Sequence, residues 1–225
     1  MGRLRDSLRS LGIADDTVLA RTADHGSHFR TRNSEYKRSV HDASVRVPLA
    51  LTGPGFRGGG LVHHPVSTAE LMPTLLAAAG IPSPDGVQGR SFLPLTGGGT
   101  DPDRPADVFV QLSEDQVGRA VRTSRWKYAV TAPDADAWND PAADRCVETE
   151  LYDLAADPHE LDNLAGLTSH RPVADTLRDA LLDWLARAGD KPAVIEPAAP
   201  RAAGQRLTES LPPQVPWEGV RFGHA

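Results

Sequence analysis

The sequence contains only one cysteine, Cys146, in 225 residues. A single cysteine cannot build an internal disulfide framework, so nothing in the sequence demands an oxidising compartment. The longest apolar run falls far short of a membrane span, and the N-terminal residues lack the apolar segment of a secretory leader. We therefore expect a cytoplasmic protein that has no membrane partner.

An excess of positive charge is also absent. The chain carries 24 Lys and Arg against 30 Asp and Glu, which gives a formal net charge of -6. This balance offers no bulk attraction to nucleic acid, so we do not expect nucleic acid as a partner. The length and the apolar fraction of 40% suit one large globular domain or two small ones, and 20 Gly with 19 Pro predict many loops.

The first 105 residues alternate helical and strand patterns. Helices are expected over residues 2–11 and 68–79, and strands over residues 17–22 and 46–52. Ser67 and Glu70 have the spacing of a capping box at the start of the second helix. Helix, short turn and strand form the repeating half-unit of an α/β fold with a parallel sheet.

The pattern changes near residue 106. Short alternating segments predict antiparallel strands over residues 108–112, 119–123, 126–130 and 150–154. An amphipathic helix follows over residues 172–188, and the rest is rich in Pro, Ala and Gly. We divide the chain into an α/β core over residues 1–105, a small α+β subdomain over 106–189 and an extended tail over 190–225.

Asp24 and His25 directly follow the first predicted strand. In open α/β sheets, ligands bind beyond the C-terminal ends of the strands. A carboxylate and an imidazole at such a place suit a hard or borderline divalent cation. The alternative is a turn-capping aspartate beside a surface histidine.

A group of basic residues follows within the next dozen positions: His28, Arg30, Arg32 and Lys37. An arginine fork and a lysine point charge both suit a tetrahedral oxyanion. The alternative is a solvated basic loop. Arg46, just before Val-Pro, has the features of a structural residue that pairs with Asp42.

Four segments of the chain resemble the C-terminal half of a sulfatase, a member of the alkaline-phosphatase-like superfamily. The resemblance lies in residues 17–26 (TVLARTADHG), 36–49 (YKRSVHDASVRVPL), 66–92 (VSTAELMPTLLAAAGIPSPDGVQGRSF) and 123–164, where RTSRWKY and ELYDLAADPHELDNLA stand. The matches keep the family's order and extend over roughly residues 1–187.

The resemblance implies a fold, an activity and a site. The fold would be a partial alkaline-phosphatase-like core, mostly a parallel sheet with helices, followed by a small antiparallel sheet with a C-terminal helix. The activity would be hydrolysis of a small-molecule sulfate ester. Asp24 and His25 would be two ligands of the divalent metal, commonly calcium in sulfatases, and Lys37 would contact the sulfate and leaving-group oxygens. His28 has no fixed family role, and we expect it to line the pocket as a further catalytic candidate.

Several family features have no counterpart in the sequence. Sulfatases attack sulfur with a formylglycine made within a Cys/Ser-x-Pro-x-Arg motif, which does not occur here, and Cys146 lies outside that pattern. The paired aspartates that complete the metal site and the upstream lysine and histidine are also absent. With two of four usual protein ligands, metal binding should be weak. We therefore expect this chain alone to be inactive.

Two other functions and a partner remain open. Relatives in the superfamily cleave phosphate or phosphonate esters or transfer phosphoryl groups, and the upstream nucleophile would discriminate between these activities. A non-catalytic interaction module is the third reading. Two explanations for the absent N-terminal half stay open: the reading frame is truncated, or a separate chain supplies that half as a partner. The adjacent His63 and His64 would point to opposite faces of a strand, so we do not expect them to chelate a metal together.

Overall fold

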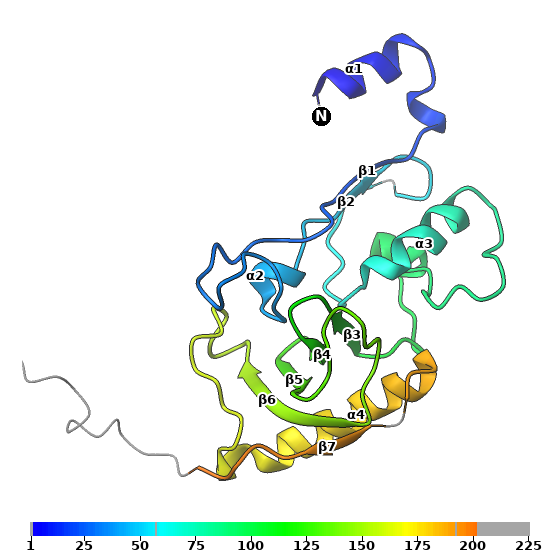
Figure 1. The fold of residues 1–225 in the computed structure, drawn as a ribbon. Coiled ribbons are helices and arrows are strands. Elements are labelled where there is room, and N and C mark those ends of the chain that lie inside the picture. The colour runs from blue at the N-terminus through cyan, green and yellow to red at the C-terminus, as the bar shows by residue number, and fades with distance from the viewer. Residues whose placement is uncertain (1, 57, 192, 202–225) are drawn as a thin grey trace, which may run out of the picture.

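The computed structural model describes residues 2–56, 58–191 and 193–201. Figure 1 shows two parts: α1 with the β1–β2 pair extends at the top, and a larger sheet with α4 lies below. The mixed α/β class and the subdomain formed by an antiparallel sheet with a C-terminal helix agree with the sequence-based prediction. The domain boundary near residue 106 stays a prediction.

The N-terminal part begins with α1 (Gly2–Ser10) and one turn of 3-10 helix, followed by β1 (Leu19–Arg21) and β2 (Ala50–Thr52). The two strands pair antiparallel, with Leu19 opposite Thr52. The parallel pairing expected from the helix-turn-strand order is wrong for this pair. The reason is the connecting segment 22–49, which doubles back on itself instead of crossing the sheet as a parallel connection must.

The apolar face of α1 is uncovered. No residue of α1 is buried, and Leu4 and the following Leu11 are 48% and 70% exposed. Neither outer edge of the β1–β2 pair is paired with another strand in the part of the chain that the structure describes. Within the described residues, the β1–β2 pair therefore has two open edges.

The middle of the chain contains short helices joined by loops: α2 (Asp42–Val45), a 3-10 turn (Thr68–Glu70), α3 (Leu71–Ala78) and a second 3-10 segment (Leu93–Gly98). The predicted capping box is confirmed: the Ser67 backbone N–H donates to Glu70 Oε2 at 2.9 Å, and the Ala69 N–H donates to Ser67 Oγ at 3.3 Å. The helix expected over 68–79 therefore starts as a 3-10 turn and continues as α3.

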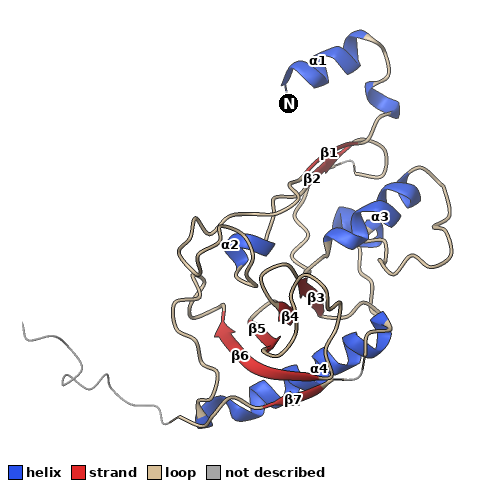
Figure 2. Cartoon of the chain, viewed as in Figure 1, coloured by secondary structure: helices blue, strands red, loops and turns tan. Residues whose placement is uncertain are grey.

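Five strands form the larger sheet, shown as red arrows in Figure 2. They are β3 (Asp107–Leu112), β4 (Val117–Thr123), β5 (Trp126–Ala132), β6 (Arg145–Asp153) and β7 (Val194–Glu196), in that spatial order. The first four pair antiparallel, as predicted, whereas β7 pairs parallel to β6. Part of the segment expected to be an extended tail, 190–225, thus forms strand β7, and residues 202–225 lie outside the described residues.

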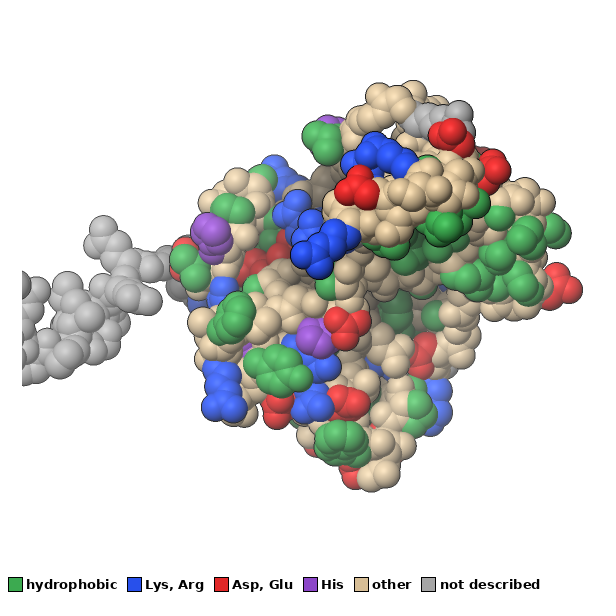
Figure 3. All heavy atoms as spheres, turned by 90° about the horizontal axis from the view of Figure 1, so that it is seen from above, with side chains coloured by type: hydrophobic (Ala, Val, Ile, Leu, Met, Phe, Trp, Pro, Cys, Tyr) green, Lys and Arg blue, Asp and Glu red, His purple; other side chains and the backbone are tan. Residues whose placement is uncertain are grey.

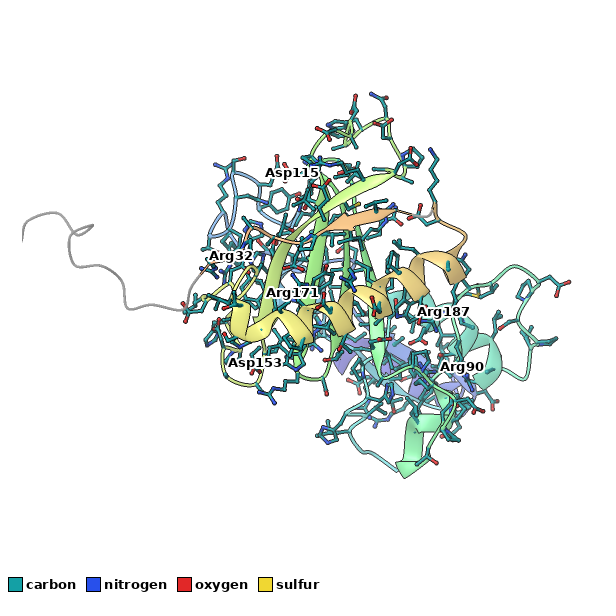
Figure 4. The ribbon with its side chains drawn as sticks, turned by 90° about the horizontal axis from the view of Figure 1, so that it is seen from below. Arg32, Arg90, Asp115, Asp153, Arg171 and Arg187 are labelled. Atoms are coloured by element: carbon teal, nitrogen blue, oxygen red, sulfur yellow. The ribbon has the colours of Figure 1, made fainter. Side chains whose placement is uncertain are left out.

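The two faces of this sheet have different coverings. The long helix α4 (Arg171–Ala188) packs on one face (Figure 4). Its Leu177 and Leu181 belong to the same buried core cluster as Tyr128 and Leu151 of the sheet. The other face carries a small cluster of buried residues around Val40, which comes from the segment between β1 and β2. Side chains alternate between the faces along each strand, so β5 presents Tyr128 to α4 and its neighbours to the segment 22–49.

No helix among the described residues is long and apolar enough to cross a membrane. The cytoplasmic location stays a prediction. Cys146 is buried, as expected for a plain thiol, and burial raises its pKa.

Candidate active site

Gly26 allows the end of β1 to pack directly on the backbone of α2. A Cβ at this position would lie 2.1 Å from the carbonyl oxygen of Ala43, so only glycine fits. The Gly26 N–H donates to the Ser44 carbonyl at 2.7 Å. This contact explains the glycine after Asp24 and His25, and it joins two of the segments in which the family resemblance lies.

Asp24 and His25 present adjacent ligand atoms. His25 Nδ1 lies 2.7 Å from the Gly26 carbonyl oxygen, and since a carbonyl only accepts, the proton is assigned to Nδ1. The free lone pair of Nε2 then lies 3.4 Å from Asp24 Oδ2. The His25 backbone N–H donates to Asp24 Oδ1 at 3.0 Å and lowers the pKa of that carboxyl, which favours the ionised form.

Lys37 is brought beside this pair by the return of the loop. The His28 N–H and the Ser27 hydroxyl both donate to the Tyr36 carbonyl, at 2.8 and 3.1 Å. The Tyr36 ring then meets the His25 ring with 6.2 Å between their centres, and Lys37 Nζ lies 5.8 Å from the centre of the Tyr36 ring. The positive charge of Lys37 also acts on Asp24.

Asp24, His25 and Lys37 line one cleft of about 1080 Å³. Its walls come from the segment 22–49, from residues 62–68 and from β3, and the lining includes Arg38, Arg46 and Arg122. Figure 3 looks onto the molecule from above and shows basic side chains gathered near the middle of this face. The cleft therefore combines two neighbouring metal-type ligands with several cations, a composition suited to an anion held beside a cation.

The two ligand residues fit part of a metal site. Among the described residues, no group of three or more His, Cys, Asp and Glu side chains could hold a metal ion. Asp24 is exposed, and the Nε2 lone pair of His25 has no protein donor, so both atoms are available to a cation. Such a pair suits two positions of a divalent site, and further ligands would have to come from outside the described residues.

Residues 34–187 match the family model for the C-terminal part of N-sulphoglucosamine sulphohydrolase. The chain belongs to the sulfatase family. It is 32% identical over 174 residues to arylsulfatase K from Bos taurus, a match that covers 73% of this chain and 30% of that protein. The chain thus spans about a third of the length of the relatives it matches.

Solved structures support the same family. A structure described as a putative sulfatase from Bacteroides thetaiotaomicron matches with a TM-score of 0.70 and 28% identity, over 83% of this chain and 40% of that one. The phosphonate monoester hydrolase from Silicibacter pomeroyi matches with a TM-score of 0.67 and 26% identity, over 83% and 38%. The resemblance seen in the sequence is confirmed, and it concerns the C-terminal portion of a sulfatase.

The structure places His28 and the pair His63–His64 differently from the expectation. His28 does not line the cleft: it is 2% exposed, and its two ring nitrogens have no protein hydrogen-bond partner among the described residues. Its backbone N–H closes the loop while its side chain turns inward, which the sequence could not show. His63 and His64 line the opposite wall, from a loop and not from a strand, and His64 Nδ1 lies 2.9 Å from the Pro65 carbonyl oxygen.

Sequence reasoning missed the partners of Asp42 in this sulfatase chain. Arg46 reaches the Asp42 carboxylate only at 3.9 Å and is itself exposed, so the predicted pair is present but weak. Arg122 and Lys127 bind the same carboxylate at 2.8 and 2.6 Å. Burial raises the pKa of Asp42, but these two cations outweigh burial and hold the pKa well below its ordinary range.

A second buried polar group lies behind the loop. His41 Nε2 is 3.2 Å from Tyr152 Oη and 3.7 Å from Glu150 Oε2. Burial raises the pKa of Glu150 to about 7, and burial lowers the pKa of His41 to about 4. Both groups are therefore held mainly in their neutral forms near pH 6.

Replacing Glu150 with glutamine should remove part of the pH dependence of stability. Because the folded pKa of Glu150 exceeds its ordinary 4.5, its contribution is complete below about pH 4.5 and is lost as the pH rises to about 7. The loss amounts to about 3 kcal/mol in the free energy of unfolding. Urea unfolding at pH 5 and pH 8 should show that, between these two values, the free energy of unfolding changes less favourably in the wild-type chain than in Glu150→Gln, by about 3 kcal/mol. His41 is present in both proteins, so its opposite dependence cancels, and equal losses in both would contradict the prediction.

Proposed function

We propose that this chain acts as the C-terminal part of a sulfatase-type hydrolase that cleaves sulfate esters with the help of a divalent metal. The observation that carries the proposal is the meeting of Asp24, His25 and Lys37 at one cleft of a sulfatase-family chain. Each of the three comes from the segment 22–49, and the contact between Gly26 and α2 sets their common position.

The proposed roles follow from the chemistry of these side chains. Lys37 would bind the sulfate oxygens and the ester oxygen as a point charge, and so stabilise the negative charge that grows on the leaving group. Asp24 and His25 would hold the metal, which supplies polarisation of the sulfate oxygens when bound. His25 would do so through Nε2, because its Nδ1 proton is engaged by Gly26. Calcium is the family's usual metal, while the imidazole ligand also suits a borderline cation.

Sulfate is favoured over phosphate by the family match. The family model is named for a sulphohydrolase of N-sulphoglucosamine and arylsulfatase K for aryl sulfates, whereas a phosphonate monoester hydrolase appears among the structural neighbours. Lys37 and the arginines of the cleft would serve either tetrahedral anion. Phosphate or phosphonate ester cleavage is therefore the second candidate, and the nucleophile of the complete site would decide between the two.

The nucleophile would come from an N-terminal sulfatase segment, which we propose as the partner of these residues. Three features of this chain support such a partner: the uncovered apolar face of α1, the unpaired edges of β1 and β2, and the incomplete metal site. An apolar helix face and open strand edges are stabilised when another part of the core covers them. A non-catalytic interaction module would use the same surfaces without turnover.

The chain alone should not hydrolyse aryl sulfates. It lacks the Cys/Ser-x-Pro-x-Arg motif and half of the metal ligands of the family. The test is a chromogenic sulfate ester incubated with the purified chain and calcium. Turnover that survives repurification and is abolished by Lys37→Ala would show that this chain holds a complete active site, against the proposal.

A further inference from the structure

A buried charge cluster lies beneath the loop that carries Lys37; its members are Asp42, Arg122, Lys127 and Glu160. They come from three distant parts of the sequence. Lys127, on β5, has no exposed surface, and its ammonium group donates to Asp42 Oδ1 at 2.6 Å and to Glu160 Oε1. Arg122, on β4, donates twice to Asp42, at 3.0 and 2.8 Å.

Glu160 makes two further contacts with the loop. Its Oε2 accepts the Asp42 backbone N–H at 2.7 Å, so one carboxylate holds both Lys127 and the first residue of α2. Its backbone carbonyl accepts from Arg32 Nη1 at 2.7 Å, and the same arginine donates to the His159 carbonyl (Arg32 is labelled in Figure 4). Glu160 itself has a φ of 55°, a left-handed conformation that costs free energy outside glycine.

Helix α2 connects the charge cluster to both parts of the candidate site, the Asp24–His25 pair and Lys37. Asp42 lies five residues after Lys37 in the chain, and Ser44 of the same helical turn accepts the Gly26 N–H next to His25. A charged lysine without solvent is costly, and it persists only where its partners satisfy it fully. The cluster therefore fixes α2, and α2 fixes the two ends of the loop that present the metal ligands and Lys37.

We propose that Lys127 and Glu160 are positioning residues: they fasten the segment 24–46 to the five-stranded sheet and so set where Lys37 stands in the cleft. The attachment of the loop to the sheet does not depend on the reaction. Its effect on anion binding by Lys37 rests on the proposed function. Neither residue lies in the cleft lining, so their effect on an anion would pass through the loop.

Hydrogen exchange tests the attachment. The variant Lys127→Met with Glu160→Gln removes one charge of each sign and keeps the volume, so the fold should persist. We expect amide exchange over residues 36–46 to rise about tenfold, while β4 and β5 stay near the wild-type rate. Arg145→Met is the matched control, because Arg145 makes exposed ion pairs on the same sheet and should change neither region. Should the double variant not fold, the isosteric Glu160→Gln alone gives the same readout.

Sulfate titration followed by the NMR signal of the Lys37 ammonium group tests the consequence. In the wild-type chain sulfate should shift this signal, and the double variant should need about tenfold more sulfate. Faster exchange without any sulfate response in the wild-type chain would uphold the attachment and contradict the anion-binding role of Lys37. Wild-type exchange over 36–46 in a folded variant would overturn the positioning proposal.

Discussion

Replacing Lys127 with methionine is expected to lower the free energy of unfolding by about 3–5 kcal/mol. The side chain has no exposed surface, and methionine fills nearly the same space, so the loss comes from charge and not from a cavity. Two buried carboxylates, Asp42 and Glu160, lose their shared ammonium partner. Asp42 keeps Arg122, so Glu160 bears most of the cost. Urea unfolding at pH 7 measures the change.

The control for this prediction separates charge balance from packing. Adding Glu160→Gln to Lys127→Met should recover most of the lost stability, because the remaining carboxylate of Asp42 still has Arg122. Arg145→Met breaks exposed ion pairs and should leave the free energy of unfolding nearly unchanged. A Lys127→Met chain as stable as the wild type would contradict the role of Lys127 as the shared partner of the two carboxylates.

Replacing Lys37 with alanine should lower kcat by about 10²–10³ in an enzyme completed with an N-terminal sulfatase fragment. The reason is the loss of a cation. This cation stabilises the negative charge on the sulfate and leaving-group oxygens, and that charge grows in the transition state. KM should change much less than kcat, since this interaction strengthens as the ester bond breaks. Initial rates on a chromogenic sulfate ester, at saturating calcium, give both constants.

Arg30→Gln is the matched control for Lys37→Ala. Arg30 belongs to the same basic loop and is exposed, but it does not line the cleft. Its replacement should leave kcat within about twofold of the unmodified enzyme, as expected for a surface change away from the site. If both substitutions have the same small effect, the loop is a solvated basic surface and not part of an active site.

Local patterns were sufficient to predict much of this fold. The spacing of leucines indicated α4, and alternation indicated β3 to β6, because each of these elements buries one face. The capping box also lies within four residues and could be read directly. By contrast, β7 is three residues long in a Pro- and Ala-rich segment, and its pairing with β6 depends on tertiary contacts that no local pattern encodes.

The residues of the candidate site also differ in whether the sequence alone could predict them. Asp24, His25 and Lys37 could be found because they follow one strand and lie close together in the sequence. The pairing of Lys127 with Glu160 could not be predicted. It depends on the face of β5 that carries Lys127 and on a turn 33 residues later that carries Glu160. One signal was present: Lys127 lies near the start of a mostly apolar strand, where a lysine must either reach solvent or find an acid. The inward turn of His28 had no such signal.

The most direct test of the account is calcium binding and sulfate-ester hydrolysis measured together on this chain, on an N-terminal sulfatase fragment that bears the Cys/Ser-x-Pro-x-Arg motif, and on their mixture. We predict weak calcium binding and no turnover for each part alone, and at least about tenfold tighter binding with turnover for the mixture, because ligand number sets affinity. Asp24→Asn should weaken both in the mixture. A mixture that binds calcium no better than its parts would contradict a shared site, and tight binding without turnover would favour a non-catalytic module.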